Sequence, residues 1–440
     1  MKGSVVLKNK SVTFLNILWI FTMVYFCLGR FKWIIPSYFF LLLYLFLNYY
    51  AMNLGYRTLN AYGSLEPSCL KDINVDPTKS FAKIKLFFII CCCATIFFEI
   101  LWVTVFVGSF SVKNVLDVIG SNYFTIQNLE FKSTNPLMQI RTLFWIVTYF
   151  TYPIGFMYFR FMTGGYKLLF CATVVVEILA SLNMGVSKNI GDLVIIYLAV
   201  LFLKTNSFAG AERHKSKQSK RMLIKIAILL MAFLMVFAFI QRSRDQASSV
   251  VNNPFLGFAE VREFSLFDLF LGKNTSLSEA FNKMGYYLSH GYAGLAYALE
   301  LPHKSTYGLG FSNSLLEYAK QYLGLSSDII RSTYNYRLES VYGWKDGEWW
   351  STSFVRIGNS VSFWFVPVVM FLLGRLFKNT EINWYREKDV TSLVLNCQLF
   401  IGFVYASCNL QIFQSRPLLI ATTLLLFIYF SRRLLKNKRG

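Results

Sequence analysis

Long apolar runs alternate with short polar segments along most of this 440-residue chain. A helix needs about 20 apolar residues to cross a bilayer, and several runs reach that length without the polar side that soluble helices turn to water. About ten runs are predicted to span a membrane, and a short run at 190–204 leaves the count open between roughly nine and twelve. They cover residues 12–29, 33–54, 85–107, 142–160, 168–184, 190–204, 222–240, 357–374, 391–408 and 417–431. The pattern therefore predicts an all-α polytopic integral membrane protein.

One long segment, residues 241–356, interrupts this pattern between the seventh and eighth predicted spans. It is too mixed in polarity to cross a bilayer, and too rich in aromatic and leucine residues for an unstructured linker. It separates an N-terminal membrane bundle of about seven helices, residues 1–240, from a C-terminal bundle of about three, residues 357–440. We expect residues 241–356 to form one large, partly helical external loop that carries the active site.

Helix signals occur inside this loop. Residues 253–271 are apolar but broken by charges, which favours a helix lying at the membrane interface. Ser276 and Glu279 have capping-box spacing, which predicts the start of a helix. The His-Gly pair at 290–291 interrupts that helix, and Gly324 is a predicted C-cap of a later one.

The net charge of +21 is distributed unevenly along the chain. Basic residues concentrate in every second connection and in the C-terminal stretch SRRLLKNKRG, which is the positive-inside pattern and places both termini in the cytoplasm. This distribution orients a multi-pass protein in its membrane and implies no nucleic-acid partner. Charged residues make up only 15% of the chain, against about 25% in soluble proteins.

The eight cysteines lie in or near the apolar runs and none lies in the large loop. A disulfide framework for the loop is therefore not expected. The sequence has no Cys-x-x-Cys spacing and no His/Cys cluster, so no metal site and no cofactor are predicted.

Six cationic residues lie where predicted spans meet the external side, against the orientation bias. They are Arg141, Lys188, Arg242, Arg244, Arg356 and Arg416. If the helices bundle, these side chains converge on a shallow site at headgroup depth, where guanidinium groups would bind diphosphate oxygens bidentately. The alternative is that each extends to the interface as an anchoring residue.

Other polar residues are candidates for chemistry. His290, between the two predicted loop helices, could accept a proton from a sugar hydroxyl, or it could be a hydrogen-bonded loop histidine. Glu99, Glu177 and Asp192 lie at membrane depth, where charge is costly. They would serve an ion-coupled carrier, or equally pair with Lys188 or Arg141. Aromatic residues between 334 and 350 could stack on sugar rings or form an interfacial belt.

Four stretches carry a resemblance to a known family: SLNMGVSKNIGDLVIIYLAVLFLK, QRSRD, YLSHGYAGLAYALE and YGLGFSNS. With the layout of spans, they resemble the repeat-unit polymerases (Wzy type) of O-antigen and capsule synthesis. In similar proteins the turn corresponding to GVSKN often carries arginine, whereas Lys188 stands there in this chain.

The resemblance implies a glycosyltransferase that joins undecaprenyl-diphosphate-linked oligosaccharides at the outer face of the membrane. The growing chain is the donor, and a hydroxyl of the incoming unit attacks its anomeric carbon. It also implies membrane lipid, a chain-length regulator and a flippase as partners. The residue roles carried over are diphosphate binding by Arg242, Arg244 and Lys188, with Arg356 and Arg416 as second choices, proton abstraction by His290, and sugar contacts by Tyr292 and Arg337.

Two other functions remain open. A ligase that moves finished polymer onto lipid A core shares the plan of many spans and one large loop. A flippase or transporter of the same lipid-linked units would need pseudo-symmetric halves, and no internal repeat is visible in the sequence.

Overall fold

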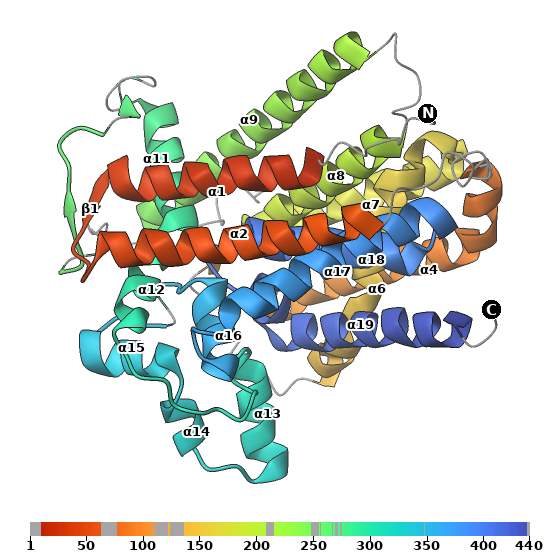
Figure 1. The fold of residues 1–440 in the computed structure, drawn as a ribbon. Coiled ribbons are helices and arrows are strands. Elements are labelled where there is room, and N and C mark those ends of the chain that lie inside the picture. Colours follow the sequence, from red (N-terminus) through yellow and green to blue (C-terminus); the bar gives the residue numbers. More distant parts are fainter. Residues whose placement is uncertain are drawn as a thin grey trace, which may run out of the picture.

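The computed structural model describes residues 10–62, 77–108, 110, 122–123, 136–207, 215–247, 255, 257–265, 267–268, 272, 275–346 and 348–437. This part of the chain is almost entirely helical (Figure 1). The helices are α1 (Lys10–Leu28), α2 (Tyr38–Tyr62), α4 (Pro77–Val107), α6 (Pro136–Tyr158), α7 (Gly164–Asn183), α8 (Lys188–Ser207), α9 (Lys215–Ala247), α11 (Ser276–Ser289), α12 (Gly291–Leu299), α13 (Asn313–Leu323), α14 (Asp328–Arg331), α15 (Tyr334–Tyr342), α16 (Ser353–Val361), α17 (Val366–Glu387), α18 (Val390–Val404) and α19 (Arg416–Asn437), with 3₁₀ turns η1 (Phe159–Phe161) and η3 (Gln411–Phe413). Two short strands, β1 (Phe31–Trp33) and β2 (Ala259–Val261), complete the fold.

Six of these helices are long and apolar enough to cross a membrane, namely α1, α2, α4, α7, α9 and α19. The pair α16 and α17 makes a seventh if it is counted as one span. The chain is therefore a predominantly helical, membrane-embedded protein. A helix also lies at each of the other predicted spans, but α6 and α8 fall outside this apolar class and α18 has only 15 residues. The count of ten spans stays a prediction.

The eighth predicted span, 357–374, is not straight. It divides into α16 and α17, whose axes are bent by 114°. Ser362 ends α16 with a φ of +70°, in the left-handed region that non-glycine residues rarely adopt. Pro367 lies in the first turn of α17, where its missing N–H costs no helical hydrogen bond. The proline therefore begins a new helix instead of continuing the old one.

The N-terminal and C-terminal membrane segments pack into one bundle, joined by a close contact between α2 and α17. Gly55 and Gly374 make this approach possible. A Cβ atom on Gly55 would lie 1.9 Å from the carbonyl oxygen of Phe371, and one on Gly374 would lie 2.1 Å from that of Met52. Only glycine leaves room for two helix backbones this close.

The large loop is tied to the bundle by a strand pair. β2 pairs antiparallel with β1, which joins α1 to α2, and places Phe31 opposite Val261, Lys32 opposite Glu260, and Trp33 opposite Ala259. The predicted interfacial helix over 253–271 is therefore wrong at β2, because these residues complete a ladder with the α1–α2 connection. Residues 253, 254, 256, 266 and 269–271 lie outside the described part of the chain.

The loop helices agree with most of their predicted signals. The break at 290–291 and the left-handed C-cap at Gly324, with φ of +63°, are confirmed. The N-cap of α11 is Thr275, whose hydroxyl accepts from the N–H of Ser278, so the cap lies one residue before the predicted Ser276.

The loop covers one end of the bundle, the end where α1 finishes and α2 begins (left in Figure 1). α11 packs on α9 and α1, and α13 packs on α19. The N–H of Ser353 donates to the carbonyl of Ala406, and the hydroxyl of Ser312 donates to that of Phe413. The connection between α1 and α2 and the connection between α18 and α19 therefore both lie against this loop.

Candidate functional site

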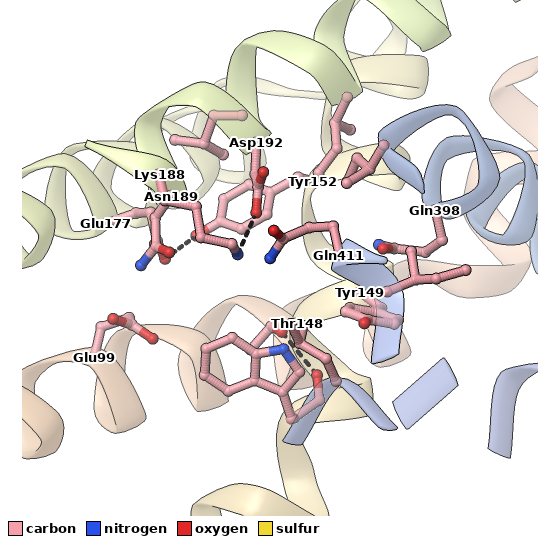
Figure 2. A pocket seen from close by; sticks show the side chains of 16 residues that line it. Glu99, Thr148, Tyr149, Tyr152, Glu177, Lys188, Asn189, Asp192, Gln398 and Gln411 are labelled. Atoms are coloured by element: carbon pink, nitrogen blue, oxygen red, sulfur yellow. Dashed lines mark hydrogen bonds and ion pairs between the residues drawn. The ribbon is translucent and has the colours of Figure 1, made fainter. Parts of the chain in front are cut away.

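A polar cavity opens among the membrane helices near the start of α8 (Figure 2). Its volume is about 60 Å³, which holds a few water molecules at ~10–15 Å³ each but no sugar ring. Polar lining groups come from α4, α6, α7, α8, α18 and η3. They are Glu99, Thr148, Tyr149, Tyr152, Glu177, Lys188, Asn189, Asp192, Gln398 and Gln411. Polar groups from six elements therefore line one cavity among otherwise apolar helices, an arrangement typical of functional sites in membrane proteins.

Lys188 lines this cavity from the first residue of α8. Its ammonium lies 2.7 Å from Oδ2 of Asp192, one helical turn later, and about a quarter of the Lys188 side chain stays exposed. The other carboxylate oxygen of Asp192, Oδ1, is buried and has no hydrogen-bond partner among the described residues. The cavity therefore contains the positive charge of Lys188 and, next to it, the incompletely hydrogen-bonded carboxylate of Asp192.

Arg141 and Glu99 form a second ion pair beside the cavity. Nη2 of Arg141 lies 3.0 Å from Oε1 of Glu99, with both side chains at least 95% buried. The guanidinium lies over the rings of Trp102 and Trp145, at 3.8 and 4.3 Å from the ring centroids. Arg141 thus compensates the charge of Glu99, and the predicted pairing of these carboxylates with Arg141 or Lys188 is confirmed for Glu99 and for Asp192.

Arg244 joins the end of α9 to the connection between α7 and α8. Its Nε donates to the carbonyl oxygen of Gly185 at 2.9 Å, Nη2 donates to the same oxygen, and its plane covers the ring of Tyr123 at 3.6 Å. Gly185 has a φ of +64°, and this turns the chain from α7 toward Lys188. Arg242, on the same turn of α9, is exposed. Lys188, Arg242 and Arg244 therefore lie on neighbouring segments.

His290 does not have a free nitrogen for proton transfer. Its Nδ1 donates to the carbonyl of Tyr286 at 2.9 Å, and its Nε2 accepts from the backbone N–H of Trp350 at 3.0 Å. Burial lowers the pKa of His290 to about 4, although backbone hydrogen bonds at Tyr286 and Tyr287 act to raise it. In this conformation the lone pair that a general base needs accepts the N–H of Trp350, so the assignment of His290 as general base stays a prediction that this geometry does not favour.

The two predicted sugar contacts are buried as well. Tyr292 is fully enclosed, and its hydroxyl bonds those of Thr22 and Tyr49 at 2.8 and 2.7 Å. Arg337 is 7% exposed; it donates to the carbonyl of Pro302 at 2.7 Å and lies over the ring of Tyr334. Neither side chain presents a surface to a sugar, because Tyr292 packs against α1 and α2 and Arg337 lies inside the loop.

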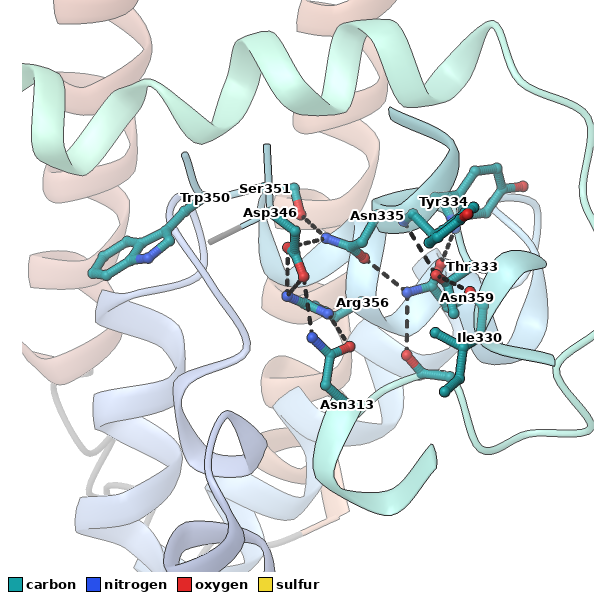
Figure 3. Close-up of polar contacts among 12 residues, drawn as sticks. Asn313, Ile330, Thr333, Tyr334, Asn335, Asp346, Trp350, Ser351, Arg356 and Asn359 are labelled. Atoms are coloured by element: carbon teal, nitrogen blue, oxygen red, sulfur yellow. Dashed lines mark hydrogen bonds and ion pairs between the residues drawn. The ribbon is translucent and has the colours of Figure 1, made fainter. Parts of the chain in front are cut away.

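Arg356 lies in a polar network inside the loop, away from the cavity (Figure 3). Its Nη2 donates to both oxygens of Asp346, at 2.7 and 3.0 Å, and its Nη1 donates to Asn313 at 2.6 Å. Burial alone would raise the pKa of Asp346, but the Arg356 charge and the neighbouring amides outweigh it and lower that pKa. Arg356 thus holds three loop segments together.

Arg416 has a partner on the loop surface. Its Nη2 lies 2.9 Å from Oε2 of Glu317, and the guanidinium lies over the ring of Tyr318. Both members of this ion pair are about half exposed. The structure therefore brings Lys188, Arg141 and Arg244 to the neighbourhood of the cavity, and it joins Arg356 and Arg416 to loop carboxylates instead.

No model of a known protein family matches the chain, and neither a curated protein nor a solved structure matches it.

Sequence reasoning missed the amides that complete the cavity. Gln411 is 2% exposed, and neither its Nε2 nor its Oε1 has a hydrogen-bond partner in the described part of the chain. It points toward Lys188 and Asp192 (Figure 2). A glutamine in a turn between two apolar runs is a common feature, so the sequence holds no signal that singles it out. The cavity combines positive charge, carboxylates and unpaired amide groups, which together suit proton transfer and polar ligands.

Proposed function

We propose that this chain is a membrane glycosyltransferase that polymerises undecaprenyl-diphosphate-linked oligosaccharide repeat units. It would act on the outer face of the bacterial cytoplasmic membrane, with both termini in the cytoplasm. A flippase would deliver its substrates and a chain-length regulator would limit its product.

The contact between stretches that carry the resemblance supports this proposal. Arg244, in QRSRD, bonds Gly185, in GVSKN. Tyr287, which begins YLSHGY, packs against Phe237 of α9 with ring centroids 6.0 Å apart. Three segments far apart in the sequence therefore meet at one corner. Residues that share one reaction need this kind of convergence.

The charges at this corner suit a diphosphate leaving group. The ammonium of Lys188 has three N–H donors and Asp192 takes one of them. The guanidinium of Arg244 has five and Gly185 takes two. The remaining donors, with Arg242 nearby, would stabilise the negative charge that develops as the sugar–diphosphate bond breaks. A lipid diphosphate already lies at headgroup depth, where these residues sit in the proposed topology.

The reaction releases a proton, so a base must accept it. The bond from the anomeric carbon to the diphosphate breaks, and the electron pair leaves with the diphosphate. A hydroxyl of the incoming unit forms the new glycosidic bond and gives up its proton. Because both nitrogens of His290 are engaged, we assign this proton to Oδ1 of Asp192, a buried carboxylate oxygen that cavity water would connect to the hydroxyl, since the cavity is too small for the sugar itself.

Purified full-length protein tests the proposal directly. Incubated with a lipid-linked repeat unit in detergent, it should produce a ladder of polymers and release lipid diphosphate. A ligase would instead transfer preformed polymer to lipid A core without lengthening it. A transporter would move the lipid-linked unit across proteoliposomes unchanged, and either result would refute the polymerase.

A further inference from the structure

The polar cavity contains more negative than positive groups. Three carboxylates belong to it, those of Glu99, Glu177 and Asp192. Arg141 pairs with Glu99 at 3.0 Å and Lys188 pairs with Asp192 at 2.7 Å. Within the described part of the chain, no lysine or arginine nitrogen lies within 4 Å of Glu177. Full ionisation would therefore leave one negative charge uncompensated.

Glu177 is 6% exposed, and its surroundings are polar but not cationic. Its Oε2 accepts from the hydroxyl of Tyr152 at 2.7 Å. The charged or polar groups that face it are Glu99 from α4, Arg141 and Tyr152 from α6, and Asn189 from α8. Glu99 and Arg141 neutralise each other, so they do not supply the missing charge.

A second buried glutamate in this protein has a cation beside it and therefore serves as a comparison for Glu177. Glu381, in α17, is 2% exposed and also accepts from a tyrosine hydroxyl, that of Tyr56. Unlike Glu177, it has the ammonium of Lys378 at 3.2 Å. The two glutamates share burial and a tyrosine partner, and they differ in the cation. A carboxylate at membrane depth without a cation beside it costs free energy. Binding a positively charged species lowers that cost.

The amide of Gln411 supplies independent evidence that the cavity is occupied. Both of its polar atoms are buried without a partner among the described residues, and the side chain points into the cavity. A buried amide without hydrogen bonds is costly. The cavity volume of about 60 Å³ accommodates a few water molecules that would satisfy it. Such water would also connect Glu177 to a source of protons.

We propose that this cavity is a proton-binding site, in which Glu177 holds one exchangeable proton at neutral pH and cavity water delivers it. The inference does not depend on the polymerase reaction. A divalent metal ion fits the site less well, because the described residues include no group of three His, Cys, Asp or Glu side chains able to hold one.

Infrared spectroscopy of the purified full-length protein in lipid nanodiscs tests the site. A protonated carboxyl group has a C=O band that an ionised carboxylate lacks. We expect this band in the wild type at pH 7, a shift of the band in D2O, and its loss in Glu177→Gln. Glu381→Gln is the matched control and should leave the band unchanged, because the ammonium of Lys378, 3.2 Å away, compensates the charge of Glu381.

Three results would overturn the proposal. The first is an identical carboxylic-acid band in the wild type and Glu177→Gln. The second is a band that D2O does not shift, since the proton would not be exchangeable. The third is a thermal stabilisation by NaCl over choline chloride at equal ionic strength that Glu177→Gln abolishes, since the ligand would then be sodium.

If Glu177→Gln does not fold, a second variant tests the proposal. Tyr152→Phe removes the hydroxyl that donates to Glu177 and leaves the carboxyl in place. The carboxylic-acid band should then remain and move in frequency. An unmoved band would assign the proton to another group and overturn the proposal.

Discussion

The guanidinium of Arg244 holds the carbonyl oxygen of Gly185, although 59 residues separate them in the sequence. The contact fixes the end of α9 to the turn that presents Lys188 at the start of α8. The turn depends on the left-handed conformation of Gly185, which a residue with a side chain adopts only with strain. Arg244 thus positions a neighbouring cation and keeps N–H donors of its own.

Replacing Arg244 should therefore affect activity strongly. Arg244→Ala removes donors aimed at the proposed leaving group, and loss of one such donor typically lowers a rate by about 10²–10³-fold. Arg244→Lys keeps the charge without the planar fork, so its activity should fall in between. Conversion of a lipid-linked repeat unit to a ladder by purified protein measures both variants.

Lys225→Ala is the control, because Lys225 is an exposed lysine near the other end of α9 and should have no effect on the ladder. Full polymer yield from Arg244→Ala, at normal protein level and thermal stability, would remove Arg244 from the reaction.

The membrane helices were predictable from the sequence because apolar length alone identifies them. A helix lies at each expected run, from Lys10–Leu28 to Arg416–Asn437. The bend between α16 and α17 was not predicted, although Pro367 inside the run was a signal for it. The strand at Ala259–Val261 could not be predicted, because its partner lies in the distant connection between α1 and α2.

The charged residues of the site were predictable from the sequence, because a charged side chain at membrane depth is costly. Which of them pair with one another was not predictable. Whether Glu99 faces Arg141 or Lys188 depends on how each helix is rotated, which apolar length does not determine. The hydrogen bond that engages the lone pair of His290 could not be predicted for a similar reason. Its partner, the N–H of Trp350, is a backbone group 60 residues away that every residue except proline offers. No residue type reveals such a contact.

The buried pair of Arg141 and Glu99 should be important for stability. Glu99→Gln leaves the arginine charge uncompensated between two tryptophan rings, which costs about 3–5 kcal/mol of unfolding free energy. Glu260→Gln is a matched control, because Glu260 pairs with Lys32 at 2.9 Å while both are more than 60% exposed. Its cost should stay under about 1 kcal/mol. Chemical unfolding in detergent compares the two, and equal costs would contradict the prediction.

The pair of Asp346 and Arg356 should stabilise the loop. Asp346→Asn removes a charged partner from Arg356, at a cost of about 1–3 kcal/mol, and should speed proteolysis of the loop. The folded state lowers the pKa of Asp346, so its contribution is complete above the ordinary aspartate pKa near ~3.9 and is lost as pH falls below it. Asp328→Asn is the control, since Asp328 is 77% exposed, and it should leave proteolysis unchanged. Equal proteolysis of Asp346→Asn and the wild type would contradict this role.

His290 should make stability depend on pH in mildly acidic solution. The folded state holds its pKa near 4 by burial, against about 6.5 in an unfolded chain. Protons therefore bind the unfolded state more tightly between these values. Stability is complete above about pH 6.5, falls as pH decreases toward 4, and loses roughly 3 kcal/mol over that interval.

Thermal unfolding in detergent across this pH interval measures the loss. His290→Ala should be less stable at pH 7 by about 1–3 kcal/mol, because the N–H of Trp350 loses its acceptor. The same variant should lose most of the pH dependence, since it has no imidazole to protonate. His303→Gln should retain that dependence, because His303 is exposed on the loop surface. A pH dependence of equal size in His290→Ala and the wild type would show that other groups bind these protons and that His290 is already accessible in the folded protein.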